Sequence, residues 1–281
     1  MALLPRYCFT TFTDVEQEEA GDTIHHTFLI APWMVGETRW YYFLGTINGT
    51  ESKSRSALFE YTRVAIPVTA YFYPDADPEV TTVDGFIQCN SVSPWNWFAC
   101  HSGPANVVDS GGLQMHLIIQ SGDADSPWWI LSRAVALFDT SAIPLGSDIL
   151  SARLRLRRSY LAYPPEWDSS STSIVFAWPT VNTHLSFADY SKFATVRFTN
   201  TVGITDPLDG DGFWRYDFKD EALIWIIAGG ITRLGIRESA HDIANRPPSP
   251  WLRRTKLQIS FWTAEKGVGY KPELRVVYKP P

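Results

Sequence analysis

The chain has 281 residues, of which 45% are hydrophobic and 19% are charged, and this balance excludes an intrinsically disordered chain. The formal net charge of −6 at pH 7 argues against a general nucleic-acid-binding protein, which would need a basic stripe or patch. Nineteen prolines and eighteen glycines, combined with few long helical patterns, predict an all-β fold.

The N-terminal residues give no indication of a leader segment. The sequence MALLPRYCFTTFTDVEQEEA lacks the sustained apolar stretch of a signal peptide. No run approaches the roughly 18 apolar residues of a membrane span. We therefore expect a protein that is made in a cytoplasm and does not insert into a membrane. The cysteines, Cys8, Cys89 and Cys100, form no regular disulfide pattern, although Cys89 and Cys100 are spaced to pair across a hairpin.

Residues 1–74 are predicted to form a small antiparallel β domain. Its expected strands are rich in aromatic and β-branched residues and cover 7–12, 25–31, 39–44, 56–64 and 65–73. A polar connection is expected over 15–22, and Asn48-Gly49 indicates a tight turn. The stretch PDADP, from Pro74 to Pro78, follows this domain. Its two prolines prevent a strand from crossing it, so we place the domain boundary there.

The second domain is predicted to cover residues 79–281. Its expected strands are short runs of apolar and aromatic residues over 80–88, 95–99, 113–120, 129–138, 150–157, 174–178, 194–198, 231–237, 256–263 and 273–278. A single short helix is predicted over 219–228, because Leu223, Ile226 and Ile227 share one helical face and two glycines follow.

Residues 133–157, RAVALFDTSAIPLGSDILSARLRLR, contain the clearest pattern in the chain. An apolar strand ends at Asp139, and the following residues have turn chemistry. After the turn, leucine and alanine alternate with serine and arginine at period two. This alternation predicts that Ala152 and Leu154 are buried and that Arg153 and Arg155 are not.

This hairpin also carries a resemblance. Together with TVDGFI (82–87), EALIWIIAGGITRLGIR (221–237) and PELRVVY (272–278), it resembles the DNRLRE-type, carbohydrate-binding-module-like β-sandwich domain over residues 80–281. The Asn-x-Gly element expected after the first strand is replaced by HSGPANVVDSGG. The resemblance implies a jelly-roll-like β-sandwich. Many relatives with this TVDG opening are uncharacterised bacteriophage proteins.

The chain lacks the common motifs of catalysis and of cofactor binding. The sequence contains no G-x-S-x-G elbow, H-E-x-x-H motif, P-loop or G-x-G-x-x-G motif, so no catalytic residue, cofactor or metal is predicted. Two weaker alternatives remain open. Asp206, Asp209 and Asp211 cluster as calcium ligands do, but without EF-hand spacing. Glu166 and Asp168 provide a carboxylate pair for glycosidic cleavage.

Candidate interface residues fall into two groups. Guanidinium groups bind carboxylates, so the arginine face Arg153, Arg155 and Arg157 is a candidate for an anionic sugar or a neighbouring subunit, with a solvated outer face as the alternative. Aromatic rings next to loops stack on sugars or anchor protein interfaces. The candidates of this kind are Trp95, Trp97, Trp128 and Trp167, with core packing as the alternative.

The expected function is that of a non-enzymatic bacteriophage virion protein, exposed as a capsid decoration, fibre or tail-accessory subunit. Its expected partners are copies of itself, with a trimer favoured by analogy with virion fibres, and other virion proteins. A cell-surface glycan is a further candidate partner. The alternatives are a carbohydrate-binding module of a secreted or surface protein and a polysaccharide-active enzyme.

Overall fold

The computed structural model describes residues 66–90, 96–123 and 128–281 in full, and the backbone of six short strands before them. The chain divides into two compact units, residues 1–65 and residues 66–281. None of the helices in the described part of the chain is long and apolar enough to cross a membrane.

The described strands of the smaller unit form three antiparallel pairs. They are β1 (Gln17–Ala20) with β2 (Thr23–His26), β3 (Thr38–Tyr41) with β6 (Phe59–Thr62), and β4 (Leu44–Ile47) with β5 (Thr50–Lys53). Ile47 pairs with Thr50, so two residues connect β4 and β5, as the Asn48-Gly49 signal predicts. The predicted polar connection over 15–22 is wrong in part, because β1 lies within it. The predicted strand over 7–12 lies outside the described residues.

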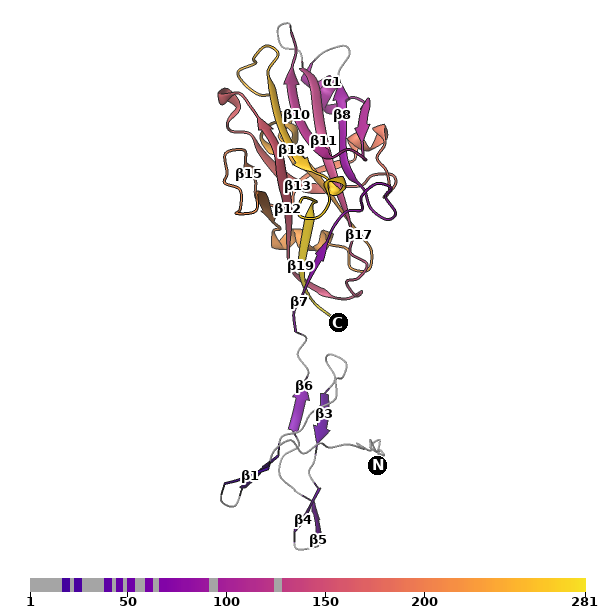
Figure 1. The fold of residues 1–281 in the computed structure, drawn as a ribbon, viewed down its shortest axis with the longest axis vertical. Helices are drawn as coiled ribbons and strands as arrows, with labels where there is room; N and C mark the ends of the chain where they lie inside the picture. Colours follow the sequence, from indigo (N-terminus) through magenta and orange to yellow (C-terminus); the bar gives the residue numbers. More distant parts are fainter. Residues whose placement is uncertain are drawn as a thin grey trace. The chain divides into compact units, whose positions relative to one another are not determined.

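The larger unit contains the remaining strands (Figure 1). They are β7 (Val68–Phe72), β8 (Asp84–Asn90), β9 (Val107–Asp109), β10 (Gln114–Ser121), β11 (Trp128–Asp139), β12 (Asp148–Ala162), β13 (Ser171–Ala177), β14 (Phe193–Arg197), β15 (Val202–Gly203), β16 (Phe213–Asp217), β17 (Ile231–Glu238), β18 (Lys256–Trp262) and β19 (Glu273–Lys279). The short helical segments are α1 (Trp97–Ser102), η1 (Pro165–Trp167), η2 (Phe187–Ser191), η3 (Asp220–Trp225), η4 (Ser239–Ile243) and η5 (Ala264–Lys266). The predicted all-β class is confirmed.

Strand pairing among the described strands is antiparallel throughout and follows the order β14-β13-β17-β11-β10-β18-β12-β19-β7, with β8 added at β11, β9 at β8, β15 at β13 and β16 at β12. The link between β10 and β11 is short, because only Ile119–Ser121 pair with the start of β11. The sheet therefore folds over at this link into two layers. One layer contains β8, β11, β17, β13 and β14, and the other contains β10, β18, β12, β19 and β7.

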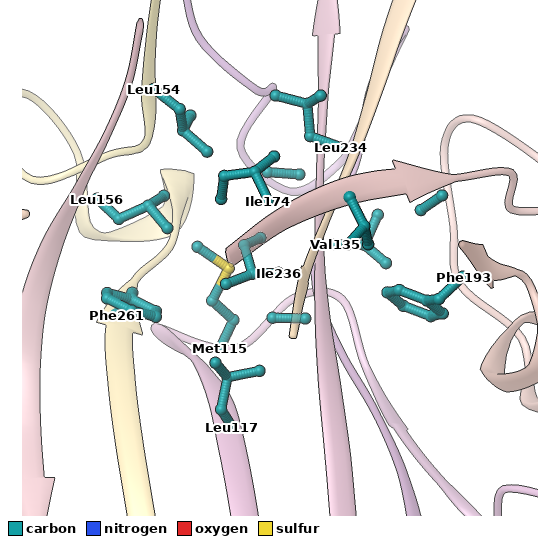
Figure 2. Packing of buried hydrophobic residues seen from close by; sticks show 14 of the residues in the cluster. Met115, Leu117, Val135, Leu154, Leu156, Ile174, Phe193, Leu234, Ile236 and Phe261 are labelled. Atoms are coloured by element: carbon teal, nitrogen blue, oxygen red, sulfur yellow. The ribbon is translucent and has the colours of Figure 1, made fainter. Parts of the chain in front are cut away.

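The core lies between these layers (Figure 2). Leu154, Leu156 and Phe261 on one layer approach Ile174 and Ile236 on the other, and all are fully buried. A second apolar contact lies on the outer face of β17, where the ring of Phe193 packs against Gly235. Only glycine fits there, because a Cβ at this position would lie 2.6 Å from that ring.

The alternation predicted for β12 is confirmed. Ala152 and Leu154 are 4% and 0% exposed, whereas Arg153 and Arg155 are only partly covered. Because side chains alternate between the two faces of a strand, one register places the leucines in the core and the arginines on the outer face.

The predicted boundary at Pro74–Pro78 is displaced. Strand β7 pairs with β19 from Val68–Tyr278 to Phe72–Leu274, so it belongs to the larger unit, which begins at Ile66. Local proline signals mark the end of β7 but cannot reveal its pairing with residues 200 positions later.

Two predicted elements differ in type. The stretch 95–99 was predicted as a strand, but Trp97–Ser102 forms α1, because the side chain of Asn96 accepts a hydrogen bond from the Ala99 amide at 2.8 Å and caps the helix. The helix predicted over 219–228 is the shorter 3-10 segment η3, which ends at Trp225. The hydroxyl of Thr232 accepts the Ile227 amide at 3.0 Å, and this bond replaces a helical one.

Candidate functional site

The arginine face of β12 lies on the outer side of its layer, next to β16 and β19. Arg155 contacts three carboxylates: Nη2 lies 3.0 Å from Asp209 Oδ2 and 3.1 Å from Asp211 Oδ2, and Nη1 lies 3.1 Å from Glu273 Oε1. Its guanidinium also lies 4.3 Å from the ring centre of Phe213. The charge of Arg155 is therefore neutralised within the chain and is not free for an external anion.

Asp209 is the central acid of this face, and its side chain is only 5% exposed. Burial alone would raise its pKa. Hydrogen bonds from the Phe213 amide and from the guanidinium groups of Arg155 and Arg215 instead lower the pKa of Asp209 to about 2. We call Asp209 and these two arginines the Asp209 cluster. This cluster argues against calcium binding by this loop, because two arginine side chains already bind the Asp209 carboxylate.

The other two arginines are bound more simply. Arg153 pairs with the exposed Asp217 at 2.5 Å. Arg157 donates to the Gly269 carbonyl at 2.7 Å, and its guanidinium lies 4.2 Å from the ring centre of Tyr270. All three arginines are thus bound to groups of the same chain, as expected for an outer face whose charges pair across strands.

Three of the four candidate tryptophans, Trp97, Trp128 and Trp167, form one cluster instead of separate loop platforms. Trp97 lies edge-on to Trp128 at 5.5 Å between ring centres, and Trp128 lies 5.9 Å from Trp167. Trp128 and Trp167 are 4% and 1% exposed, so their proposed role as accessible ligand or interface residues is wrong. Trp97 is half-buried and donates to Asn245 Oδ1 at 2.9 Å. Trp95 lies outside the described residues.

A different set of four aromatic residues includes two accessible tryptophans. Trp178, Phe176, Trp225 and Phe198 follow one another with ring-centre separations of 5.6, 4.7 and 5.6 Å. Trp178 is 42% exposed and Trp225 is 37% exposed. We call these four residues the aromatic row. The period-two spacing of Phe176 and Trp178 was a signal for it, but the contribution of Trp225 depends on the η3 geometry.

A shallow cavity of about 360 Å³ lies beside the aromatic row. Trp225 and Phe198 form part of its wall, and Lys219, Glu221 and Thr195 contribute polar groups. An aromatic wall with polar groups around it is suited to a sugar ring or to the side chains of another protein.

The most buried charges of the larger unit have a structural role that sequence reasoning missed. Asp242 is fully buried and receives Arg133 Nη2 and Arg237 Nη2 at its Oδ1, both at 2.7 Å. Burial would raise the pKa of Asp242, but the charges of the two arginines hold it well below its usual range. The two arginines also donate to the carbonyls of Tyr190 and Ala194. This network joins β11, β17 and the segments that cover them.

The remaining candidates are a carboxylate pair and two cysteines. Glu166 and Asp168 are both exposed around the η1 turn. Cys89 and Cys100 are buried and are not joined in a disulfide, and the Cys100 thiol donates to the Trp128 carbonyl at 3.0 Å.

Comparison with known proteins gives no identification: no family model matches the sequence, and no curated protein matches it.

Proposed function

We propose that this chain is a non-enzymatic structural protein of a bacteriophage particle, exposed as a capsid decoration, fibre or tail-accessory subunit. The resemblance of residues 80–281 to phage-borne β-sandwich domains motivates the proposal. The β-sandwich is consistent with a building or binding scaffold, although a fold alone assigns no function.

The aromatic row is the observation that carries the proposal. Val196 lines the same cavity as Trp225, and Ile224 precedes Trp225 in η3; they are 68% and 77% exposed. Exposed aromatic and apolar side chains gathered in one place are typical of surfaces that bind another protein. We propose that copies of this chain, with a trimer favoured, and other particle proteins meet at such surfaces.

Immunogold electron microscopy and mass spectrometry of purified phage particles test the proposal. We expect the chain to be present in washed particles at a stoichiometric level and to be labelled on their surface. Its absence from particles that carry every other structural protein would contradict it.

A carbohydrate-binding module is the second candidate, and the cavity beside Trp225 favours it. If this candidate is correct, a glycan array will detect binding that Trp225→Ala abolishes while the oligomeric state stays unchanged. Phe98→Ala is the matched control, because Phe98 is 71% exposed and belongs to α1, outside the aromatic row.

A further inference from the structure

One edge of the β-sandwich ends at a strand that no further strand covers. Strand β14 is the last in the pairing order, and within the described part of the chain it pairs with β13 alone. The pairing involves Phe193 and Arg197, whereas Thr195 and Val196 between them are exposed. Residues of β14 and of η3 line the same shallow cavity. The cavity therefore opens at a free edge of the sheet.

Ile224 lies at the rim of this cavity. In a 3-10 helix, side chains three positions apart lie one above the other, so Ile224 aligns with Glu221, and Trp225 aligns with Ala222. Glu221, Ala222 and Trp225 all line the cavity, which has room for a branched aliphatic side chain. The surface thus carries an exposed apolar side chain and, beside it, a hollow that this side chain does not fill. We call this region the η3 surface, and its members are Thr195, Val196, Lys219, Glu221, Ile224 and Trp225.

The η3 surface also carries two charges of opposite sign. Among the ion pairs between described residues, none includes Lys219 or Glu221. A partner surface of a single charge would attract one of them and repel the other. A second copy that is related by a two-fold axis instead presents a glutamate to each lysine and a lysine to each glutamate. The charges therefore make the surface complementary to itself, as contacts across a two-fold axis require.

We propose that the η3 surface binds the η3 surface of a second copy of this chain across a two-fold axis. Ile224 of each copy enters the cavity of the other beside Trp225, and Lys219 of each copy pairs with Glu221 of the other. The inference rests on that part of the proposed function in which copies of the chain meet, and it names the surface at which they do so. A two-fold contact joins chains in pairs, so a trimer that is held through another surface would associate into a hexamer.

Sedimentation velocity of the full chain at micromolar concentrations tests the proposal. We expect the wild type to form an assembly with an even number of 31.8 kDa chains. Glu221→Lys places two lysines opposite each other at two symmetric positions, so it should weaken association at least about tenfold. The double variant Lys219→Glu/Glu221→Lys restores opposite signs, and we expect it to recover the wild-type association.

The apolar contact is tested separately. Ile224→Asp brings a charge to the cavity of the second copy, so it should weaken association by at least about a hundredfold. Val268→Asp is the matched control, because Val268 is almost fully exposed and lies outside the η3 surface, in the segment between η5 and β19. It should leave association unchanged. Circular dichroism checks that each variant is folded, and the charge exchange replaces Ile224→Asp if that variant is not.

Three results would overturn the pairing. The first is a wild-type chain that is monomeric or trimeric at micromolar concentration. The second is a wild-type assembly that Glu221→Lys leaves intact or that the double variant does not restore. The third is a monomeric chain that binds a glycan through Trp225, which would assign the cavity to a sugar. None of these results changes whether the chain is present in purified phage particles, so the pairing and the particle role fail independently.

Discussion

The carboxyl groups of Asp209 and Asp84 are both buried, but their surroundings differ. Both are almost removed from solvent. Asp209 is held by two guanidinium groups and by backbone amides, and its pKa falls to about 2. Asp84 has one amide donor and two acidic neighbours, and burial raises its pKa. Burial alone therefore does not determine the charge of a carboxylate in this fold; the partners do.

Asp242 extends this comparison to complete burial. Two arginines share its two oxygens, so the desolvation of three charges is offset by direct contacts. From Asp242 through Asp209 to Asp84, the negative charge of the carboxylate is balanced by fewer neighbouring cations. A variant at each position measures how much the partners contribute.

Asp242→Ala should have the largest effect. It leaves Arg133 and Arg237 buried without their shared partner, and such a loss costs about 3–5 kcal/mol. Denaturant unfolding of the full chain, with β-sheet circular dichroism as the signal, measures this free energy. A cost below about 1 kcal/mol would mean that water replaces Asp242. The two arginines would then not depend on its charge.

Arg155→Ala should have a smaller effect, about 1–3 kcal/mol, because Asp209 loses one of its two guanidinium partners but keeps Arg215 and its amides. The same unfolding experiment measures it. A wild-type stability for this variant would show that the arginine face behaves as a solvated surface.

Arg153→Ala should have the smallest effect, below about 1 kcal/mol, because its partner Asp217 is 65% exposed and solvent screens the pair. It is the matched control for Arg155→Ala, since both residues lie on the same face of β12. If the two variants lose equal stability, the contacts to Asp209 carry no special weight.

The pH dependence of stability should separate Asp209 from Asp84 by sign. Asp209 has a lowered pKa, so its contribution is present above about pH 4 and is lost as the pH falls toward 2. Asp84 has a raised pKa, so its contribution is present below about pH 4 and is lost as the pH rises. Glu238, whose pKa burial raises to about 7, acts in the same direction as Asp84.

Unfolding across this pH range should therefore be compared between variants. Asp84→Asn should reduce the loss of stability above pH 4, and Asp209→Asn should reduce the loss below it. If Asp84→Asn changed the loss below pH 4 and Asp209→Asn changed the loss above it, the contrast between Asp209 and Asp84 would be wrong.

Sequence patterns predicted the parts of the fold that are local. The alternation of leucine and arginine in β12 fixed its buried face, because a shift of one residue would bury the arginines. The Asn48-Gly49 signal likewise matched a two-residue connection. These predictions needed only neighbouring residues.

The sites were not predictable in the same way, because their partners are distant in sequence. Glu265 acts electrostatically on Asp84, and Arg133 binds Asp242. In each pair the second residue lies more than a hundred positions later in the sequence. Trp128 and Trp167 had the composition of loop platforms but pack against each other in the core. Composition identifies which residues are able to bind, whereas the sheet pairing decides which of them are accessible.

The most direct test of the contrast between Asp209 and Asp84 is the pKa of Asp84, measured from its carboxyl carbon chemical shift by NMR. Burial beside acidic neighbours predicts a pKa well above the usual value near 4. A pKa of Asp84 at or below 4 would contradict this contrast.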